Sequence, residues 1–163
     1  MQPTRIRDLL VVAVVATGVA YLVTRFNYSS IPQLPRLAGL TAALIGVGEG
    51  IAGAGLRARI HDQLRSETIG DRPRRPPVPP LLAARALSVA KASALAAAAL
   101  AGLWLGFGLY VIPKASVVAA ADADTGTAII GLVCAGVLLA GALYLEKCCR
   151  TPKNGPPTAD GAR

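Results

Sequence analysis

The sequence predicts an all-α fold: an integral membrane bundle of four transmembrane helices, arranged as two helical hairpins joined by a basic cytoplasmic loop. Of the 163 residues, 53% are hydrophobic and only 16% are charged, whereas about a quarter are charged in soluble domains. The apolar residues gather in four blocks bounded by charge or proline. We therefore expect one membrane domain over residues 1–152, followed by a disordered tail over 153–163.

The first predicted helix covers residues 9–25. The apolar run between Asp8 and Arg25 spans about 24 Å at ~1.5 Å per residue, slightly less than the ~30 Å hydrocarbon core. The basic start and short apolar run also fit a cleaved secretory signal peptide, with Gly18 and Ala20 as small residues near a cleavage point. We favour a retained helix, because the apolar run continues past Ala20.

The second and third predicted helices cover residues 36–56 and 81–112. Each has small residues at every fourth position, a spacing that lets helix backbones approach closely in lipid. These ladders are Ala42, Gly46, Gly50, Ala54 and Ala94, Ala98, Gly102, Gly106. We expect them to pack helices within one chain rather than to pair two copies. The third helix exceeds the membrane thickness, so Arg85 should lie on a projecting turn and Lys91 at the boundary.

The polar insert over residues 57–80 is rich in arginine and proline, and the fourth predicted helix covers 125–146. We interpret the insert as a loop whose proline-rich part favours an extended polyproline II spacer. Of the 17 Lys and Arg residues, 14 lie in the N-terminal segment, in 57–91 or in the C-terminal segment, and the two opposite loops hold Arg25, Arg36 and Lys114. By the positive-inside rule, the chain is a multi-pass protein of the plasma (inner) membrane with both termini cytoplasmic.

Glu49 is the single carboxylate of the second predicted helix. An ionised carboxylate within hydrocarbon costs about 2.5 kcal/mol or more, so Glu49 should face the bundle and be paired or protonated. Lys91 is the favoured ion-pair partner, with Ser93 and Ser88 as hydrogen-bond partners. We favour a polar clamp between helices over a proton- or cation-handling site, because an ion path normally contains several intramembrane acids.

The remaining candidates are the insert arginines and a cysteine pair. The net charge of +8 is better explained by positive charge held on the cytoplasmic side of a membrane than by binding to nucleic acid. We interpret the insert as a solvated loop that touches anionic lipid headgroups, with contact to an unknown membrane protein partner as the alternative. The candidate contacts are Arg57, Arg59, Arg72, Arg74, Arg75 and Arg85. Cys148 and Cys149 could be reactive thiols beside Lys147, but they lack the second ligand pair of a zinc site. We expect no metal, cofactor or catalytic residue.

Several short motifs together resemble a known family. They include Pro3-Thr4-Arg5, Leu34-Pro35, Ala84-Arg85-Ala86, Ala90-Lys91-Ala92-Ser93, Gly102-Leu103-Trp104 and Cys148-Cys149-Arg150 with Pro152. The chain resembles, from Gln2 to Pro152, small actinobacterial membrane proteins that carry a domain of unknown function and are often encoded near folate-biosynthesis genes. This resemblance implies four helices in the inner membrane and implies no activity.

Two functional hypotheses follow. The first is a non-enzymatic structural or accessory subunit of the cell envelope, which docks to another membrane protein through its helices or its basic loop. The alternative is a small transporter or proton-coupled membrane subunit that uses Glu49 and Lys91. A membrane enzyme is disfavoured, since no cluster of acids, histidines and nucleophiles converges in the sequence.

Overall fold

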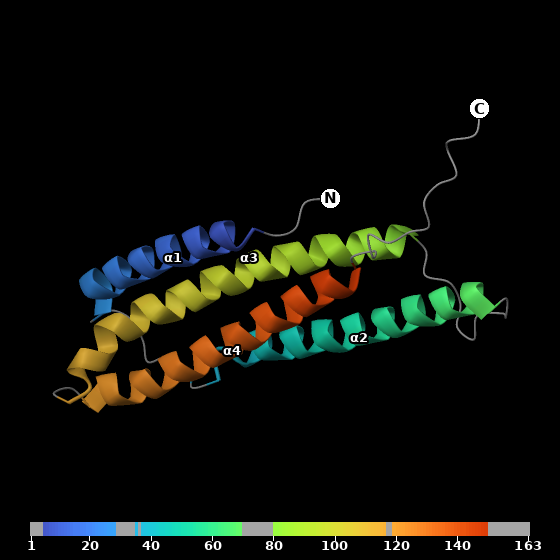
Figure 1. The fold of residues 1–163 in the computed structure, drawn as a ribbon. Coiled ribbons are helices and arrows are strands. Elements are labelled where there is room, and N and C mark those ends of the chain that lie inside the picture. The colour runs from blue at the N-terminus through green and yellow to red at the C-terminus, as the bar shows by residue number, and fades with distance from the viewer. Residues whose placement is uncertain (1–4, 29–34, 36, 70–79, 117–118, 150–163) are drawn as a thin grey trace.

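Four long helices make up the described part of the computed structural model (Figure 1). The structure describes residues 5–28, 35, 37–69, 80–116 and 119–149. The helices are α1 (Ile6–Asn27), α2 (Leu40–Ile69), α3 (Pro80–Val111) and α4 (Ala119–Cys149), and a short 3-10 turn, η2 (Ile112–Lys114), follows α3. The predicted all-α class is confirmed.

The helices lie side by side in the order α1, α3, α4, α2, and each packs against the next (Figure 1). α1 and α3 run in one direction, whereas α2 and α4 run in the other. One end of the bundle therefore holds the start of α1, the end of α2, the start of α3 and the end of α4. We call it the basic end, because Arg7, Arg57, Arg85 and Lys147 lie towards these ends of their helices, and we call the opposite end the loop end.

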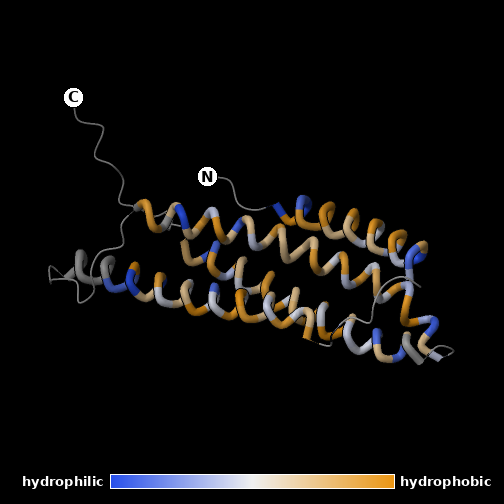
Figure 2. The backbone as a smooth tube through the Cα atoms, turned by 180° about the vertical axis from the view of Figure 1, so that it is seen from behind, coloured by the Kyte–Doolittle hydropathy of each residue, from blue (hydrophilic) through white to orange (hydrophobic). Residues whose placement is uncertain are grey.

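Three helices within the described residues are long and apolar enough to cross a membrane. They are Ile6–Asn27, Ala84–Lys114 and Ala121–Cys149. Figure 2 shows hydrophobic residues along most of these helices and hydrophilic residues towards the bundle ends. α2 is not among them, because glycines and Glu49 interrupt its apolar half and its second half is charged. The structure thus suggests a membrane protein, while the fourth predicted span is not confirmed.

Prolines bound α3 close to its predicted limits of 81 and 112. Pro80 occupies the first turn, where a missing backbone N–H leaves no hydrogen bond unmade. Pro113 cannot donate the next helical hydrogen bond, and the chain tightens into η2. Between them, many alanines and leucines favour an uninterrupted helix.

The boundaries predicted for the other helices are less accurate. α2 begins at Leu40 and continues to Ile69, so the loop predicted over 57–80 is wrong for 57–69. That stretch contains no proline or glycine, and its arginine, glutamine and glutamate residues form helices well. Likewise α4 begins at Ala119 rather than at 125. The rest of the predicted loop up to 79 and the predicted tail lie outside the described residues.

The predicted ladder of α3 packs against α1, within the chain. A Cβ atom added at Gly106 would lie 2.9 Å from the Tyr21 backbone nitrogen, and one added at Gly102 would lie 2.8 Å from Ala16 Cβ. Ala94 continues the ladder in a buried cluster with Leu9 and the α4 residue Ala142. The contact is therefore backbone against backbone, as in other helix pairs that associate in lipid.

The contact between α2 and α4 uses a different spacing from the predicted one. Gly39, Gly46 and Gly53, seven residues apart, each face α4 closely, whereas a Cβ at Gly50 would meet open space and Ala54 is exposed. The ladder predicted on this helix is therefore wrong beyond Gly46. A seven-residue repeat is typical of helices that cross at a small left-handed angle.

Candidate functional site

Glu49 is a buried carboxylate on α2, with 8% of its surface exposed. It lies three residues after Gly46 and four before Gly53, so its side chain falls on the helix face that these glycines turn towards α4. The Ser93 hydroxyl of α3 donates a hydrogen bond to Glu49 Oε1, as predicted. The second oxygen, Oε2, is buried and has no hydrogen-bond partner in the described part of the chain.

The hydrogen bond between Ser93 and Glu49 joins two helices that are separated in the packing order by α4. It therefore has the geometry of a clamp across the bundle. A carboxylate with one satisfied oxygen and one buried, unsatisfied oxygen is also able to hold a proton or a small cation. The same residue thus suits both hypotheses, and its neighbours decide between them.

Lys91 lies on α3, half-buried and slightly nearer the basic end than Ser93. Ala94 of α3 and Ala142 of α4 belong to one buried cluster, and this register brings Lys91 near the height of the buried Glu146. The ion pair between Glu49 and Lys91 stays a prediction. Ser88, the other predicted partner, is exposed and donates to the Ala84 carbonyl at 3.1 Å instead.

A second polar cluster lies at the loop end. The Tyr28 hydroxyl donates a hydrogen bond to Asp124 Oδ2 at 3.0 Å, and Asp124 is 7% exposed. The Tyr28 ring also packs against the Tyr110 ring, with centroids 5.4 Å apart, and the Lys114 ammonium lies 3.5 Å from the Tyr110 centroid. The cluster ties α1, α3 and α4 together. Sequence reasoning missed Asp124, because it placed this residue in a loop.

Replacing Tyr28 with phenylalanine is expected to destabilise the bundle by about 1–3 kcal/mol, because Asp124 loses the phenol that donates to it. Burial, and then the hydrogen bond to Asp124, raise the pKa of Tyr28 above its ordinary value of 10.0. The phenol therefore stays protonated in the folded chain where the unfolded chain already loses the proton. Its contribution is present below the ordinary pKa and is lost as the pH rises through the folded pKa.

Melting temperatures in detergent should thus fall more steeply above pH 10 in the wild type than in Tyr28→Phe, since the wild-type phenol's ordinary pKa is 10.0. Tyr144→Phe is the control, since Tyr144 is exposed. Equal pH dependence in wild type and Tyr28→Phe would contradict a role for this phenol.

The other predicted residues are not brought together with Glu49. Arg57, Arg59 and Arg85 are exposed at the basic end, and Arg72, Arg74 and Arg75 lie outside the described residues. Cys148 is buried and Cys149 is half-buried, both as free thiols. Among the residues that the structure describes, no group of three or more His, Cys, Asp or Glu side chains is placed to hold a metal ion.

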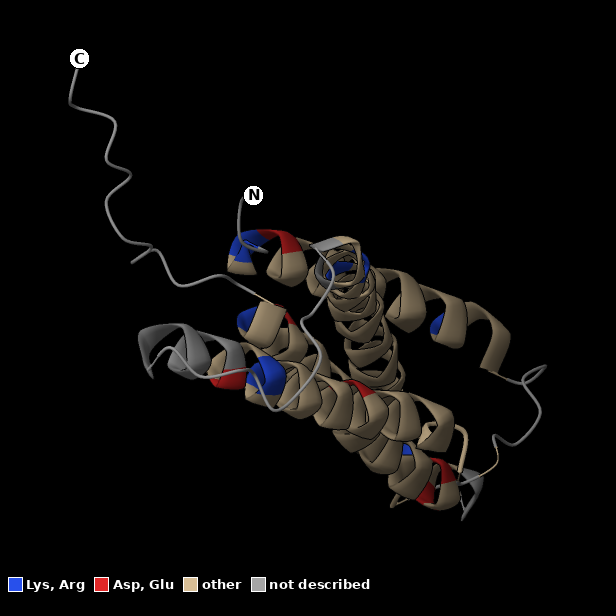
Figure 3. Ribbon diagram, turned by 90° about the vertical axis from the view of Figure 1, so that its right-hand side faces the viewer, with Lys and Arg blue, Asp and Glu red and all other residues tan. Residues whose placement is uncertain are grey.

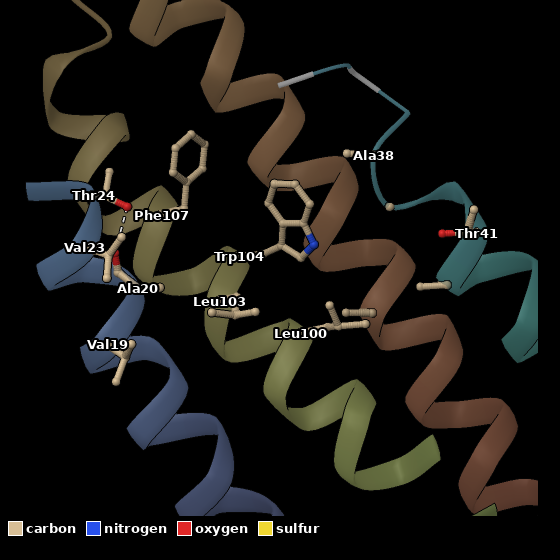
Figure 4. A pocket seen from close by; sticks show the side chains of 13 residues that line it. Val19, Ala20, Val23, Thr24, Ala38, Thr41, Leu100, Leu103, Trp104 and Phe107 are labelled. Carbon is tan, nitrogen blue, oxygen red and sulfur yellow. Dashed lines mark hydrogen bonds between the residues drawn. The ribbon is translucent and has the colours of Figure 1, made fainter. Parts of the chain in front are cut away.

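An apolar groove of about 380 Å³ lies between α1 and the start of α2, over the faces of α3 and α4 (Figure 4). Val19 and Val23 form its α1 wall, and Ala38 belongs to its opposite wall. Leu103 and Trp104 of α3 form its floor. No local pattern in the sequence indicates this groove, because the groove depends on the separation of α1 from α2.

The chain belongs to the family described as a protein of unknown function, DUF3180, whose model matches residues 9–153. The match extends over all four helices. The resemblance suggested by the polar motifs is confirmed in that the chain carries a domain of unknown function. No significant match was found among curated proteins or among solved structures.

Proposed function

We propose that this DUF3180 member is a non-enzymatic accessory subunit of the cell envelope, which associates with another membrane protein through the outer face of α1. The observation that supports this proposal is that the other helices of the bundle cover only a small part of α1. Only 17% of its apolar window is buried, against 39% for α3 and for α4. A helix held on one side leaves room for a second helix on the other.

The outer face of α1 has the features of a helix-docking surface. Val14 and Leu22 are exposed on it, and Gly18 lies between them with nothing within 4 Å of an added Cβ. A glycine flanked by larger apolar residues leaves a notch that lets a partner backbone approach. Gly102 and Gly106 of α3 form such notches, and they receive the opposite side of α1 within the chain.

Photo-crosslinking from native membranes tests the docking surface. A photoreactive residue at Val14 is expected to give a discrete protein adduct that Gly18→Ile abolishes, because isoleucine fills the notch. The same photoreactive residue at Ile51, which is exposed on α2, is the control. Lipid adducts alone at Val14, or an adduct that survives Gly18→Ile, would refute docking at this face.

We further propose that the basic end faces the cytoplasm and that α2 spans the inner membrane as the fourth helix. The positive-inside rule supports this orientation, since Lys and Arg gather at the basic end (Figure 3). A cysteine at Asp122, which is exposed at the loop end, should react with an impermeant maleimide on intact cells. Protection of that cysteine until the cells are lysed would reverse the orientation.

A proton-coupled or transport role is the second candidate. It is favoured by one observation, the buried Oε2 of Glu49 without a hydrogen-bond partner in the described residues. An acid in a membrane bundle is costly and often functional. Lys91 and Glu146 near the same height could complete a path for protons towards the basic end.

A further inference from the structure

The groove between α1 and α2 lies in the hydrocarbon region if its helices span the membrane. Three of the four helices that form it are apolar enough to do so. Its walls are mostly alkyl and aromatic, from Val19, Val23, Leu103 and Phe107. The buried Thr24 hydroxyl in the wall already donates to the Ala20 carbonyl at 2.7 Å. The groove therefore suits an apolar occupant.

We propose that this groove binds a single hydrocarbon chain of a membrane lipid. The groove volume of about 380 Å³ falls within the range of small-ligand sites. A flexible alkyl chain is narrow enough to enter it.

The bilayer also supplies this occupant at high concentration. An empty groove leaves its wall atoms without dispersion contacts, and lipid tails are as apolar as the leucines that line it. The groove lies nearer the loop end, since it is formed by the second half of α1 and the start of α2. The lipid headgroup would accordingly rest at the loop end and the chain would extend towards the bundle centre.

Trp104 reports on this site directly, because it is the single tryptophan of the chain. Its ring extends from α3 across the groove floor and packs against Gly131 of α4 (Figure 4). A tryptophan sealed inside a helical bundle would be shielded from lipid chains. A chain in the groove would instead lie against the ring.

The test is quenching of Trp104 fluorescence in vesicles of phosphatidylcholine that carries bromine on its acyl chains. The wild type is expected to show strong quenching that rises with the fraction of brominated lipid, because brominated and ordinary chains compete equally for the groove. Ala38→Phe, which places a bulky side chain in the groove wall, should remove most of it. Ala54→Phe, an exposed alanine of α2 outside the groove, should leave it unchanged.

Two outcomes would overturn the proposal. The first is no quenching in the wild type, which means that the groove is closed or filled by protein. The second is equal quenching in Ala38→Phe and the wild type, which means that lipid reaches Trp104 by another route. Neither of these outcomes bears on docking at the opposite face of α1, so the two proposals fail independently.

Discussion

Gly141→Val is expected to separate α2 from α4 and to destabilise the bundle by about 1–3 kcal/mol or more, the range for overpacked interiors. A Cβ at Gly141 would lie 3.0 Å from the Gly46 Cα atom and would meet the Gly46 carbonyl more closely still. These are backbone atoms of the facing helix, so no side chain can rotate away. The only relief is to move one helix away from the other.

The matched control is Gly136→Val on the same helix. A Cβ at Gly136 meets nothing within 4 Å, so the substitution adds the same volume on an open face. Both variants have the same cost in helix propensity. A difference between them therefore measures the contact with α2 rather than the change from glycine to a β-branched residue.

A disulfide supplies the readout. A Cβ at Gly39 would lie 3.0 Å from the Cβ of the native Cys134, close to the ~3.5–4.5 Å that a disulfide needs after a small shift. Gly39→Cys should thus oxidise with Cys134 when Cys148 and Cys149 are replaced by serine. Maleimide–polyethylene glycol labelling counts the thiols that remain. An undiminished yield in Gly141→Val would show that valine is accommodated at this contact.

The sequence predicted the helical class and the limits of α3 well, because both depend on local signals. A long apolar run and the prolines at its ends decide where α3 begins and stops, whatever packs around it. The limits of α2 were harder to predict from the sequence. Its charged stretch up to Ile69 was interpreted as a loop because charged residues indicate exposure to water. A helix can, however, continue beyond the membrane into water.

The helix contacts could not be read from composition. In a chain with 17 glycines, small residues recur at spacings of four and of seven, and both patterns pass through Gly46. Which pattern is used depends on the crossing angle, and that angle depends on the partner helix. Asp124 was placed in a loop, and its hydrogen-bond partner Tyr28, which follows α1, lies 96 residues away in the sequence, so no local pattern indicated the pair.

Ser93→Ala is expected to destabilise the bundle by about 1–3 kcal/mol or more, because it removes the hydroxyl that donates to Glu49 Oε1. Glu49 Oε2 already lacks a partner in the described residues, so the carboxylate would then be buried with both oxygens unsatisfied. In a Glu49→Leu background the same serine substitution should cost little, since no acceptor remains. The difference between the two costs is the coupling energy of the clamp.

Thermal unfolding in detergent, followed by exposure of the buried Cys134 thiol to a fluorogenic maleimide, measures both costs. If Ser93→Ala lowers the stability equally in the wild-type and Glu49→Leu backgrounds, the hydrogen bond between Ser93 and Glu49 contributes nothing to stability. Glu49→Leu itself combines opposing effects. It loses a hydrogen bond that contributes about 1.5–3 kcal/mol and removes an unsatisfied oxygen that costs about 1–3 kcal/mol, so its stability should stay near the wild type.

That near-balance separates the two functional hypotheses. If the Glu49→Leu protein is as stable as the wild type, stability does not require an acid at this position. Any activity that depends on Glu49 must then come from its charge or its proton. Glu49→Leu and Glu49→Gln should then both retain the crosslinked partner of an accessory subunit. A well-folded Glu49→Gln protein that keeps its partner but loses a proton-dependent flux would instead establish the coupled role, because glutamine keeps a hydrogen-bond acceptor for Ser93 but cannot exchange a proton.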